Sequence, residues 1–448
     1  MKKPPLLPPP LPLSIHAYGS DGQGVSRLPD GMTCFVSGAL RGETCLVQLD
    51  KVGKTCAWGH VQELLEPSPA RQEPDCPHFP SCGGCALRHM TYPEELEFKR
   101  QKVSDCLTRI GGCQTPVSVI YGAKNTDRYR NKVQFPISGS SIGFYAAGTH
   151  AVTDVEDCLL QPQSSARLRR ALKEYMALYQ VPAYDERTGR GLLRHLYVRS
   201  NQAGESLCCL LCNGKSLPHE PQLVETLRQA EPSLKGIVLG VNERKTNVIL
   251  GDSYRTLWGQ DHLMDHMCSL SFRLSVPSFY QVNTPQAELL YGLALDYAAL
   301  TGTETALDLY CGIGTITLCL ARRARRAIGA EIVPQAIADA KANAQRNGIE
   351  NTEFFCGDAS QIAARLAQEG TRPHVITVDP PRKGLAGDVV SSIACMAPER
   401  VVYISCDPAT LARDVHRFAQ EGYLLQKAAA VDLFPRTPHV ETVALLKK

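Results

Sequence analysis

The sequence contains no stretch that approaches the roughly 20 unbroken apolar residues of a membrane-spanning helix, so we expect no membrane segment. Prolines at positions 4, 5, 8, 9, 10 and 12 would interrupt any apolar leader helix, and we interpret residues 1–13 as a flexible, proline-rich tail. The sequence also lacks a large excess of either charge. Its net charge of +3 over 448 residues is too small to identify a nucleic-acid partner. The 18 cysteines are scattered through segments typical of strands and helices, which favours a reduced, cytoplasmic location.

Basic residues are nevertheless concentrated locally. Residues 86–135 carry nine Lys or Arg and five Asp or Glu, a local excess of +4. Within them, the RYRNK segment at residues 128–132 interleaves cations with an aromatic ring, a combination suited to phosphates and a stacked base, although a solvated edge strand would look the same. The RRARR segment at residues 322–326 closes a predicted helix, and we expect it mainly to complement the helix dipole.

The length and the residue pattern predict a multidomain α/β protein with three domains. Residues 14–66 alternate short strand-like runs with turns, typical of a small OB-like β-barrel, and resemble the TRAM module through the GQGV sequence at residues 22–25. Residues 75–270 combine a charged helix with many strand-like runs, which predicts a central α+β domain. Helices and strands alternate over residues 271–448, which predicts a Rossmann-like, doubly wound parallel sheet with its ligand site at the carboxyl ends of the strands.

A glycine loop follows the first predicted strand of that sheet. Residues 308–315, DLYCGIGT, lead from a strand into a helix, and Glu331 closes the next strand, where a carboxylate can accept hydrogen bonds from both ribose hydroxyls. The third glycine of a dinucleotide fingerprint is missing, which favours S-adenosylmethionine over a nicotinamide cofactor. Asp358 ends the following strand and is a candidate acceptor for an adenine amino group, or a helix N-cap.

Two further strand ends carry reactive side chains. Asp379 is followed by Pro380 and Pro381, which hold the backbone rigidly at the cleft, as in loops of nucleobase methyltransferases. Cys406 follows a buried strand and precedes a helix, whose N-terminus is expected to lower the pKa of the thiol and make it a nucleophile. Most cysteines are merely small buried apolar residues, which is the alternative for Cys406.

Four other cysteines form a candidate metal site. Cys76, Cys82 and Cys85, joined by Cys158, offer four soft thiolates, enough for a four-iron cluster or a tetrahedral zinc ion. Nearby histidines keep zinc open as the alternative. A radical S-adenosylmethionine enzyme would need a C-x3-C-x2-C triad, and the first gap here is five residues.

Two segments, SCDPATLARD at residues 405–414 and PHVETV at residues 438–443, resemble the signatures of the RNA uracil-5-methyltransferase family. The resemblance also includes FYQVN at residues 279–283, the glycine loop, the Asp379 loop and the cysteine cluster, so it spans residues 76–448. It implies methyl transfer from S-adenosylmethionine to C5 of a uridine in RNA. Cys406 would add to C6 of the uracil, and Glu441 would remove the C5 proton.

The resemblance also implies binding residues and partners. The residues expected to bind S-adenosylmethionine are Gln281, Tyr310, Glu331 and Asp379, with Asp358 near the adenine and Thr315 at a position where some relatives have Asn. The four cysteines would hold a four-iron, four-sulfur cluster. We expect a monomer that acts on a looped or flipped-out uridine, in 23S ribosomal RNA by preference and in transfer RNA as the alternative.

Two other functions remain in contention. A noncatalytic RNA-binding iron–sulfur protein would be expected to lack Cys406 or Glu441, and both are present. A methyltransferase acting by direct displacement on an exocyclic nitrogen would need the Asp379 loop and no Cys406. A covalent adduct that depends on Cys406 would exclude the second.

Overall fold

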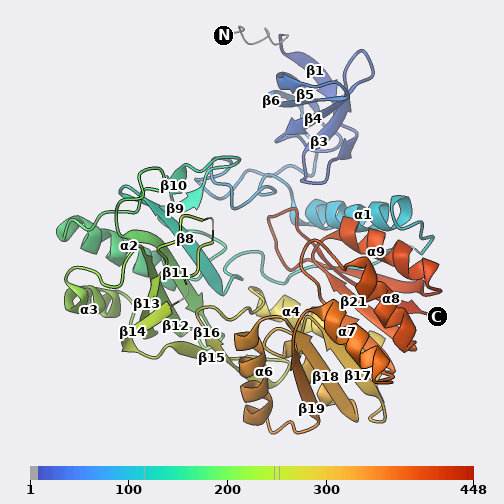
Figure 1. Ribbon diagram of the computed structural model, residues 1–448. Helices are drawn as coiled ribbons and strands as arrows, with labels where there is room; N and C mark the ends of the chain where they lie inside the picture. The colour runs from blue at the N-terminus through green and yellow to red at the C-terminus, as the bar shows by residue number, and fades with distance from the viewer. Residues whose placement is uncertain (1–8, 116, 247, 252) are drawn as a thin grey trace.

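The computed structural model describes residues 9–448 except 116, 247 and 252. Figure 1 shows an N-terminal sheet, a central domain of strands and helices, and a C-terminal sheet covered by helices. Among the described residues, no helix combines the length and the apolar character needed to cross a lipid bilayer.

The N-terminal sheet curls back on itself. Its six strands are β1 (Leu11–Ser14), β2 (Ala17–Tyr18), β3 (Gly24–Arg27), β4 (Thr33–Ser37), β5 (Thr44–Val52) and β6 (Cys56–Glu66), in the order β1-β5-β6-β4-β3-β2. The two edge strands, β1 and β2, follow each other directly in the chain, which brings the two edges of the sheet close together. Ser26 Oγ in β3 donates a hydrogen bond to Ser14 O in β1 over 2.8 Å. Strand β1 begins at Leu11, inside the segment expected to be a tail, whereas residues 1–8 of that segment lie outside the described residues.

The central domain is built on a seven-stranded sheet. Its strands are β10 (Val152–Asp154), β9 (Ser141–Tyr145), β8 (Lys132–Ser138), β11 (Leu193–Ser200), β12 (Ser206–Cys212), β13 (Leu234–Val241) and β14 (Ser253–Gly259), in that spatial order. Helices α2 (Gln163–Leu178) and α3 (Glu220–Ala230) contribute to its apolar core. The three cysteines of β12 are fully buried there and serve as small apolar side chains.

The C-terminal domain contains the predicted parallel sheet. Its strand order is β19-β18-β17-β20-β21-β23-β22-β7, and only β23 runs antiparallel to its neighbours. The strands are β17 (Thr305–Leu309), β18 (Arg326–Glu331), β19 (Thr352–Cys356), β20 (Val375–Val378), β21 (Arg400–Ser405), β22 (Leu424–Val431), β23 (Glu441–Lys447) and β7 (Ile120–Tyr121).

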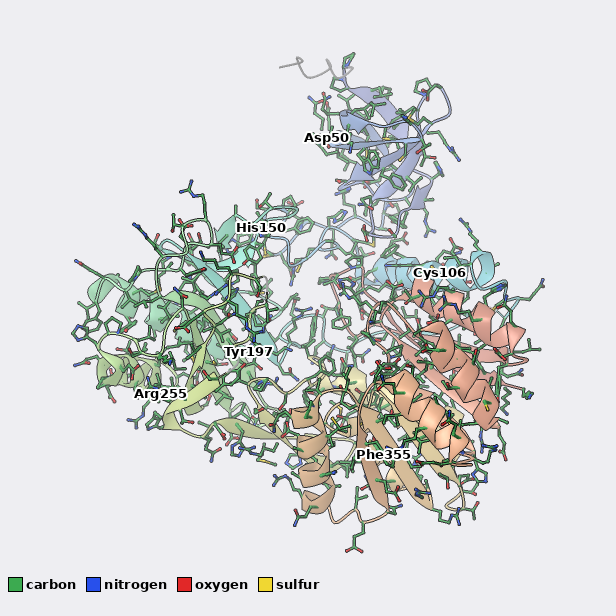
Figure 2. All side chains as sticks on the ribbon, viewed as in Figure 1. Asp50, Cys106, His150, Tyr197, Arg255 and Phe355 are labelled. Carbon is green, nitrogen blue, oxygen red and sulfur yellow. The ribbon has the colours of Figure 1, made fainter. Side chains whose placement is uncertain are left out.

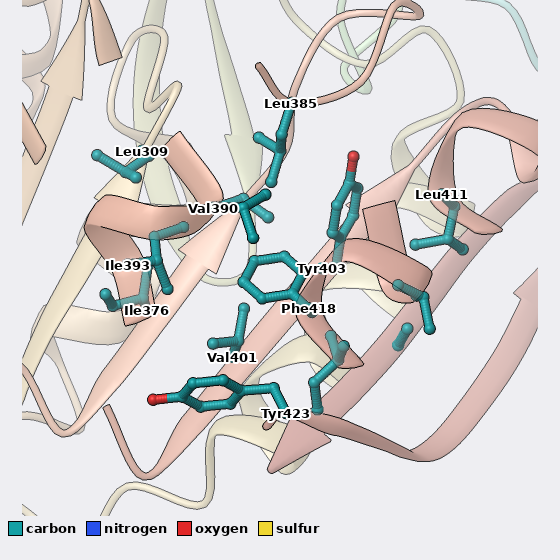
Figure 3. Packing of buried hydrophobic residues seen from close by; sticks show 14 of the residues in the cluster. Leu309, Ile376, Leu385, Val390, Ile393, Val401, Tyr403, Leu411, Phe418 and Tyr423 are labelled. Carbon is teal, nitrogen blue, oxygen red and sulfur yellow. The ribbon is translucent and has the colours of Figure 1, made fainter. Parts of the chain in front are cut away.

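Helices cover both faces of this sheet. They are α4 (Thr284–Ala298), α5 (Thr315–Ala321), α6 (Pro334–Arg346), α7 (Ala359–Gln368), α8 (Gly387–Met396) and α9 (Pro408–Gln420). Figure 3 shows one of the two cores, where the α8 and α9 side chains pack on β20 and β21. The other core lies under α4 and α5.

Two segments expected in the central domain pack on the C-terminal domain instead. Helix α1 (Tyr92–Arg109) lies against α9, and β7 pairs with β22 at the edge of the sheet. The hairpin of β15 (His262–Met267) and β16 (Leu270–Ser275), at the boundary expected near residue 270, packs on both domains: it contributes to the core under α4, and its Leu263 packs on the central sheet. A sequence pattern shows which face of a helix is buried but not what covers it, which explains the difference.

A buried ionic group fastens α1 in place. Lys99 Nζ donates to Glu95 Oε1 over 2.7 Å and to Asp432 Oδ1 over 2.6 Å, and all three side chains are fully buried. Arg436 N donates to the same Glu95 carboxylate over 2.7 Å. Removal of one partner of a buried ion pair lowers the stability of a protein by about 3–5 kcal/mol. The contact between α1 and the loop after β22 therefore depends on all three side chains.

Candidate functional site

The glycine loop bends sharply after β17. Tyr310 has φ of 72°, and the N–H groups of Tyr310 and Cys311 both donate to Ala330 O over 2.9 Å. Gly312 and Gly314 have φ of 54° and 86°, backbone conformations that favour glycine. Gly314 then caps α5. The loop is thus held against β18 at the carboxyl ends of the strands, with Gly312 half-buried and Gly314 buried.

Acidic side chains follow β18 and β19 at the same edge. The Glu331 carboxylate is half-buried and accepts from Gly312 N over 3.2 Å and Val333 N over 3.0 Å. Asp358 is exposed and caps α7, accepting from Ser360 N over 2.9 Å, and these hydrogen bonds from Ser360 lower its pKa. The N-cap role foreseen as the alternative for Asp358 is therefore present. Thr315, half-buried, is the first residue of α5.

Gln281 enters the site from the segment that joins the central and C-terminal domains. It is 8% exposed, and its carbonyl accepts from Asn131 Nδ2 over 2.9 Å. Its side chain hydrogen-bonds the buried hydroxyl of Tyr291; burial and the charge of Asp379 raise the pKa of Tyr291, and the hydrogen bond from Gln281 opposes them. Gln281 and Asp379 therefore both lie near the same buried side chain.

Asp379 follows β20 next to a second, deeper carboxyl group. Asp308 in β17 is fully buried and accepts from Thr317 Oγ1 over 2.5 Å and from Thr377 Oγ1 over 3.0 Å. Burial raises the pKa of each of the two aspartates to about 7, and the charge of Asp308 contributes to the rise at Asp379. Both carboxyl groups thus titrate near neutral pH.

Cys406 and Glu441 are brought together by the antiparallel strand β23. Ser405 at the end of β21 pairs with Thr442 in β23, so Cys406 and Glu441, one residue beyond this pair, come out at the same edge. Cys406 is half-buried and Glu441 is 3% exposed. Asp379, at the end of neighbouring β20, completes the group.

The expected lowering of the Cys406 pKa is wrong. Burial raises the pKa of the thiol to about 11, and the charges of Glu441 and Asp379 act in the same direction. Asp407 explains why the helix does not compensate, because its carboxylate accepts from Ala409 N over 3.0 Å and Thr410 N over 2.9 Å and so takes up free N–H groups of α9. Burial also raises the pKa of Glu441, to about 8.

The four cysteines of the candidate cluster converge from two segments. Burial raises the pKa of Cys158 to about 12, and the charges of Cys85, Cys82 and Cys76 contribute, so all four lie within electrostatic reach of one another. Gly84 N donates to Cys82 Sγ over 3.4 Å. Over the described residues, no group of three or more His, Cys, Asp or Glu is arranged so that it could hold a metal ion.

The RYRNK segment has a more structural role than expected. Arg128 donates to Asp157 Oδ1 over 2.8 Å and to Cys158 O over 2.9 Å, and the Tyr129 hydroxyl donates to Pro435 O over 3.0 Å. Lys132 instead lies 5.9 Å from the ring centroid of Phe279, whose side chain is 62% exposed. Phe279, rather than Tyr129, is therefore the ring available for stacking.

The second basic segment lies between α5 and β18 and makes local contacts. Arg322 caps α5 and donates to Cys268 O over 2.8 Å. Arg326 pairs with Glu353 at 2.6 Å.

The sequence pattern of the tRNA (Uracil-5-)-methyltransferase family matches residues 92–448. The match covers most of the chain, including every strand of the C-terminal sheet. The chain belongs to this family. The resemblance drawn from the two signature segments is therefore confirmed.

Relatives of the family match along almost the whole chain. A Halalkalibacterium halodurans protein named as an uncharacterized RNA methyltransferase is 43% identical over 442 residues, 97% of this chain and 96% of its own. A Clostridium tetani protein of the same description is 42% identical over 439 residues, 97% and 95% of the two chains. The crystal structure of the Pyrococcus abyssi tRNA (uracil-54, C5)-methyltransferase with S-adenosyl-L-homocysteine is similar at a TM-score of 0.79 and 26% identity, covering 97% of this chain and 99% of that one.

One charged residue of the cleft was not singled out from the sequence. Arg382 follows the proline pair, and its charge lowers the pKa of both Cys406 and Glu441, opposing the effect of burial. Its side chain is exposed. The sequence could have pointed to Arg382, because it directly follows Asp379-Pro380-Pro381. Arg382 thus lies within electrostatic reach of both Cys406 and Glu441.

Proposed function

We propose that the protein transfers a methyl group from S-adenosylmethionine to C5 of a uridine in RNA through a covalent bond between Cys406 and C6. The observation that carries this proposal is the adjacency of Cys406 and Glu441 at the edge of the sheet where the glycine loop also lies. A thiol can add to an electron-poor ring, and a carboxyl group beside it can then remove a proton, so this pair of side chains suits the two steps of the reaction.

The residues fit the requirements of the reaction. C5 of uracil is a poor nucleophile. Once the Cys406 thiol has given its proton to solvent, attack of the thiolate on C6 moves the electron pair of the double bond into an enolate that makes C5 nucleophilic. After C5 has been methylated, Glu441 takes the C5 proton, the double bond re-forms and the C6–S bond breaks, which returns the Cys406 thiolate. The positive charge of Arg382 favours the thiolate in both the first and the last step.

S-adenosylmethionine supplies, when bound, an electrophilic methyl group on a cationic sulfur. The glycine loop fits such a ligand, because a Cβ built on Gly312 would have no atom within 4 Å, so the space beside its backbone is open. Glu331 would accept from the ribose hydroxyls, with Asp358 toward the adenine. Tyr310, Thr315, Gln281 and Asp379 would hold the remainder of the ligand, and the Pyrococcus abyssi neighbour with S-adenosyl-L-homocysteine supports this assignment.

The RNA is proposed to be 23S ribosomal RNA, with transfer RNA as the alternative. The N-terminal sheet was an argument for ribosomal RNA, but the Pyrococcus abyssi transfer RNA enzyme covers 97% of this chain and so matches that region too. The two RNA classes are therefore tested side by side.

The deciding experiment offers wild-type protein and S-adenosylmethionine two transcripts that contain 5-fluorouridine, 23S ribosomal RNA and transfer RNA. We expect a covalent protein–RNA band on a denaturing gel with one of them, because fluorine at C5 cannot leave as a proton does. The same transcripts with ordinary uridine serve as the control and should give no stable band. Methylation of an exocyclic nitrogen without any adduct would overturn the proposal.

We also propose that Cys76, Cys82, Cys85 and Cys158 hold a four-iron, four-sulfur cluster. The four thiols are not arranged as a metal site among the described residues, but they lie within electrostatic reach of one another and are the donor type that such clusters use. Arg88, which hydrogen-bonds Cys85, supplies a positive charge beside them. The loop that carries Cys85 continues into Ala86 and Leu87, whose N–H groups donate to Arg436 O over 3.0 and 3.2 Å. The cluster would thereby brace the loop that leads to Glu441.

Replacing Cys158 with serine is expected to remove iron from the anaerobically purified protein. Wild type should contain about four iron and four sulfide per chain and absorb broadly in the visible range. Cys113→Ser, also half-buried but outside the group of four, is the matched control and should keep its iron. One zinc per chain in wild type in place of iron, lost in Cys158→Ser, would show that the site binds zinc.

A further inference from the structure

The central domain contains a cavity separate from the catalytic cleft. It has a volume of about 640 Å³ and lies between the end of β8, strands β9 and β10, and residues 181–187. Ligand pockets commonly have volumes of about 300–1,000 Å³. None of the residues assigned above to the reaction, the cofactor or the cluster lines it.

Two buried polar side chains line this cavity at the start of β11. His195 and Arg194 are 6% and 4% exposed, yet neither ring nitrogen of His195 has a hydrogen-bond partner within the described part of the chain. Buried polar groups are normally hydrogen-bonded, so an unpartnered imidazole points to a ligand. A β-bulge between Leu193 and His195 allows the neighbours Arg194 and His195 to face the same cavity.

The His195 ring is electrically neutral. Burial, with the charge of Arg194, lowers the pKa of His195 to about 4, so at pH 7 the ring offers one N–H donor and one nitrogen acceptor. Arg194 is fixed, because its Nη1 donates to Asn242 O over 2.9 Å and to Arg244 O over 2.7 Å. A neutral donor and acceptor side by side match the edge of a nucleobase better than an ion.

Aromatic rings form the walls. The Tyr184 ring lies 4.3 Å from the Arg194 guanidinium, and Tyr145 at the rim contacts His150, with ring centroids 5.8 Å apart. Tyr184 is 6% exposed and Tyr145 36%, while Arg187 at the rim is exposed. Asp185 and Glu186, next to Arg187, are exposed as well, so the lining as a whole is not basic. Rings for stacking with a cation nearby are features that bind single-stranded nucleic acid.

A second hollow extends from this cavity toward the cysteine loop and the N-terminal sheet. It shares Tyr145 and His150, and runs over residues 146–149 to Gly83 in the cysteine loop and Asp21 in the N-terminal sheet. Figure 2 labels His150 on the part of the central domain that faces the N-terminal sheet. An RNA strand in this groove would contact the central domain, the cysteine loop and the N-terminal sheet.

We propose that the cavity beside His195 takes an unstacked base of the substrate RNA, a different nucleotide from the methylated uridine. The inference rests on the proposed function, because it assumes that RNA is the substrate, and it names where a second nucleotide is held. His195 pairs with the edge of the base, Tyr184 and Tyr145 contact its faces, and Arg187 lies near its phosphate.

The test is the affinity for labelled 23S ribosomal RNA and transfer RNA transcripts, measured by filter binding. Tyr145→Ala and His195→Phe are each expected to weaken binding of the substrate class by about 10-fold, the size usual for loss of one stacked base. Single-turnover methylation at saturating RNA should change by less than about twofold. Tyr121→Ala is the matched control, because Tyr121 is also 36% exposed and lies in β7, away from the cavity.

The outcomes separate this inference from the proposed function. Variants that bind both RNAs as tightly as Tyr121→Ala overturn it, even if wild type methylates uridine normally. If wild type forms no uridine adduct while Tyr145→Ala still loses RNA binding, the proposed reaction fails and the binding site stands. Should His195→Phe fail to fold, as seen by circular dichroism, Tyr145→Ala at the exposed rim decides alone.

Discussion

Replacing Cys406 with alanine is expected to abolish methyl transfer and the covalent protein–RNA complex together. Loss of a covalent nucleophile removes the only step that makes C5 reactive, so the rate should fall by at least about 10⁴-fold. The measurement is single-turnover transfer of a radiolabelled methyl group to RNA, with a denaturing gel of the 5-fluorouridine transcript run in parallel. RNA affinity should change little, because the side chain is small and half-buried.

The control for this variant is Cys395→Ala. Cys395 is exposed on α8 of the same domain, and its removal should leave the rate at the wild-type value. Methyl transfer that persists in Cys406→Ala would assign the chemistry to direct displacement, with Asp379 as the group at the acceptor atom. Loss of activity in both variants would point to a general sensitivity of the domain instead.

Replacing Glu441 with glutamine is expected to stop the reaction one step later. Glutamine has nearly the shape of the glutamate but takes no proton, so addition and methylation proceed while elimination does not. The variant should therefore accumulate a covalent complex with ordinary uridine RNA and release one equivalent of S-adenosylhomocysteine per chain. Steady-state turnover should fall by about 10²–10⁴-fold, the usual contribution of a positioned base.

The pH dependence gives this prediction a second measurement. Burial raises the pKa of Glu441 to about 8, so the group carries a proton below that pH and is a carboxylate above it. In wild type, breakdown of the covalent complex should therefore accelerate as the pH rises through about 8. A Glu441→Gln protein that turns over normally, with the same pH profile, would transfer the role of base to another group, of which Asp379 is the nearest candidate.

The same shift provides a test that the variant is folded. A carboxyl group whose pKa is raised on folding from 4.5 to about 8 favours the folded state only while protonated, so stability is lost as the pH rises between these values. Glu441→Gln should melt with wild type at pH 4 and above it at pH 9. The glutamine variant is thus expected to be inactive and more stable at alkaline pH.

The placement of the reacting groups was predictable because of one property of parallel sheets. Glu331, Asp379 and Cys406 each follow a strand, and the carboxyl ends of parallel strands share an edge. Glu441 begins a strand instead, and only the antiparallel direction of β23 brings it to that edge. The prediction of Glu441 rested on the resemblance of PHVETV to a family signature, because a local sequence pattern does not show in which direction a strand runs.

Other properties depend on contacts between distant segments. The raised pKa of Cys406 results first from burial and then from the charges of Glu441 and Asp379, which come from other parts of the chain. The Asp407 carboxylate takes the helix N–H groups on which the expectation relied. Arg128 looked available for RNA but pairs with Asp157, 29 residues away. The cavity beside His195 depends on a bulge that leaves no mark in the sequence.

The pairing of β7 with β22 has a consequence for how the protein is made. Lys99 is synthesised 333 residues before Asp432, whose carboxylate accepts its hydrogen bond in the folded protein. Until the last part of the chain has been translated, α1 can pack only on earlier residues, through Phe98 against Leu40 and Leu87, while its partner helix α9 and the strand β22 that pairs with β7 are still missing. The catalytic domain is thus encoded at two distant places in the reading frame. A gene cut near residue 270 separates them, and neither half can specify the complete catalytic sheet.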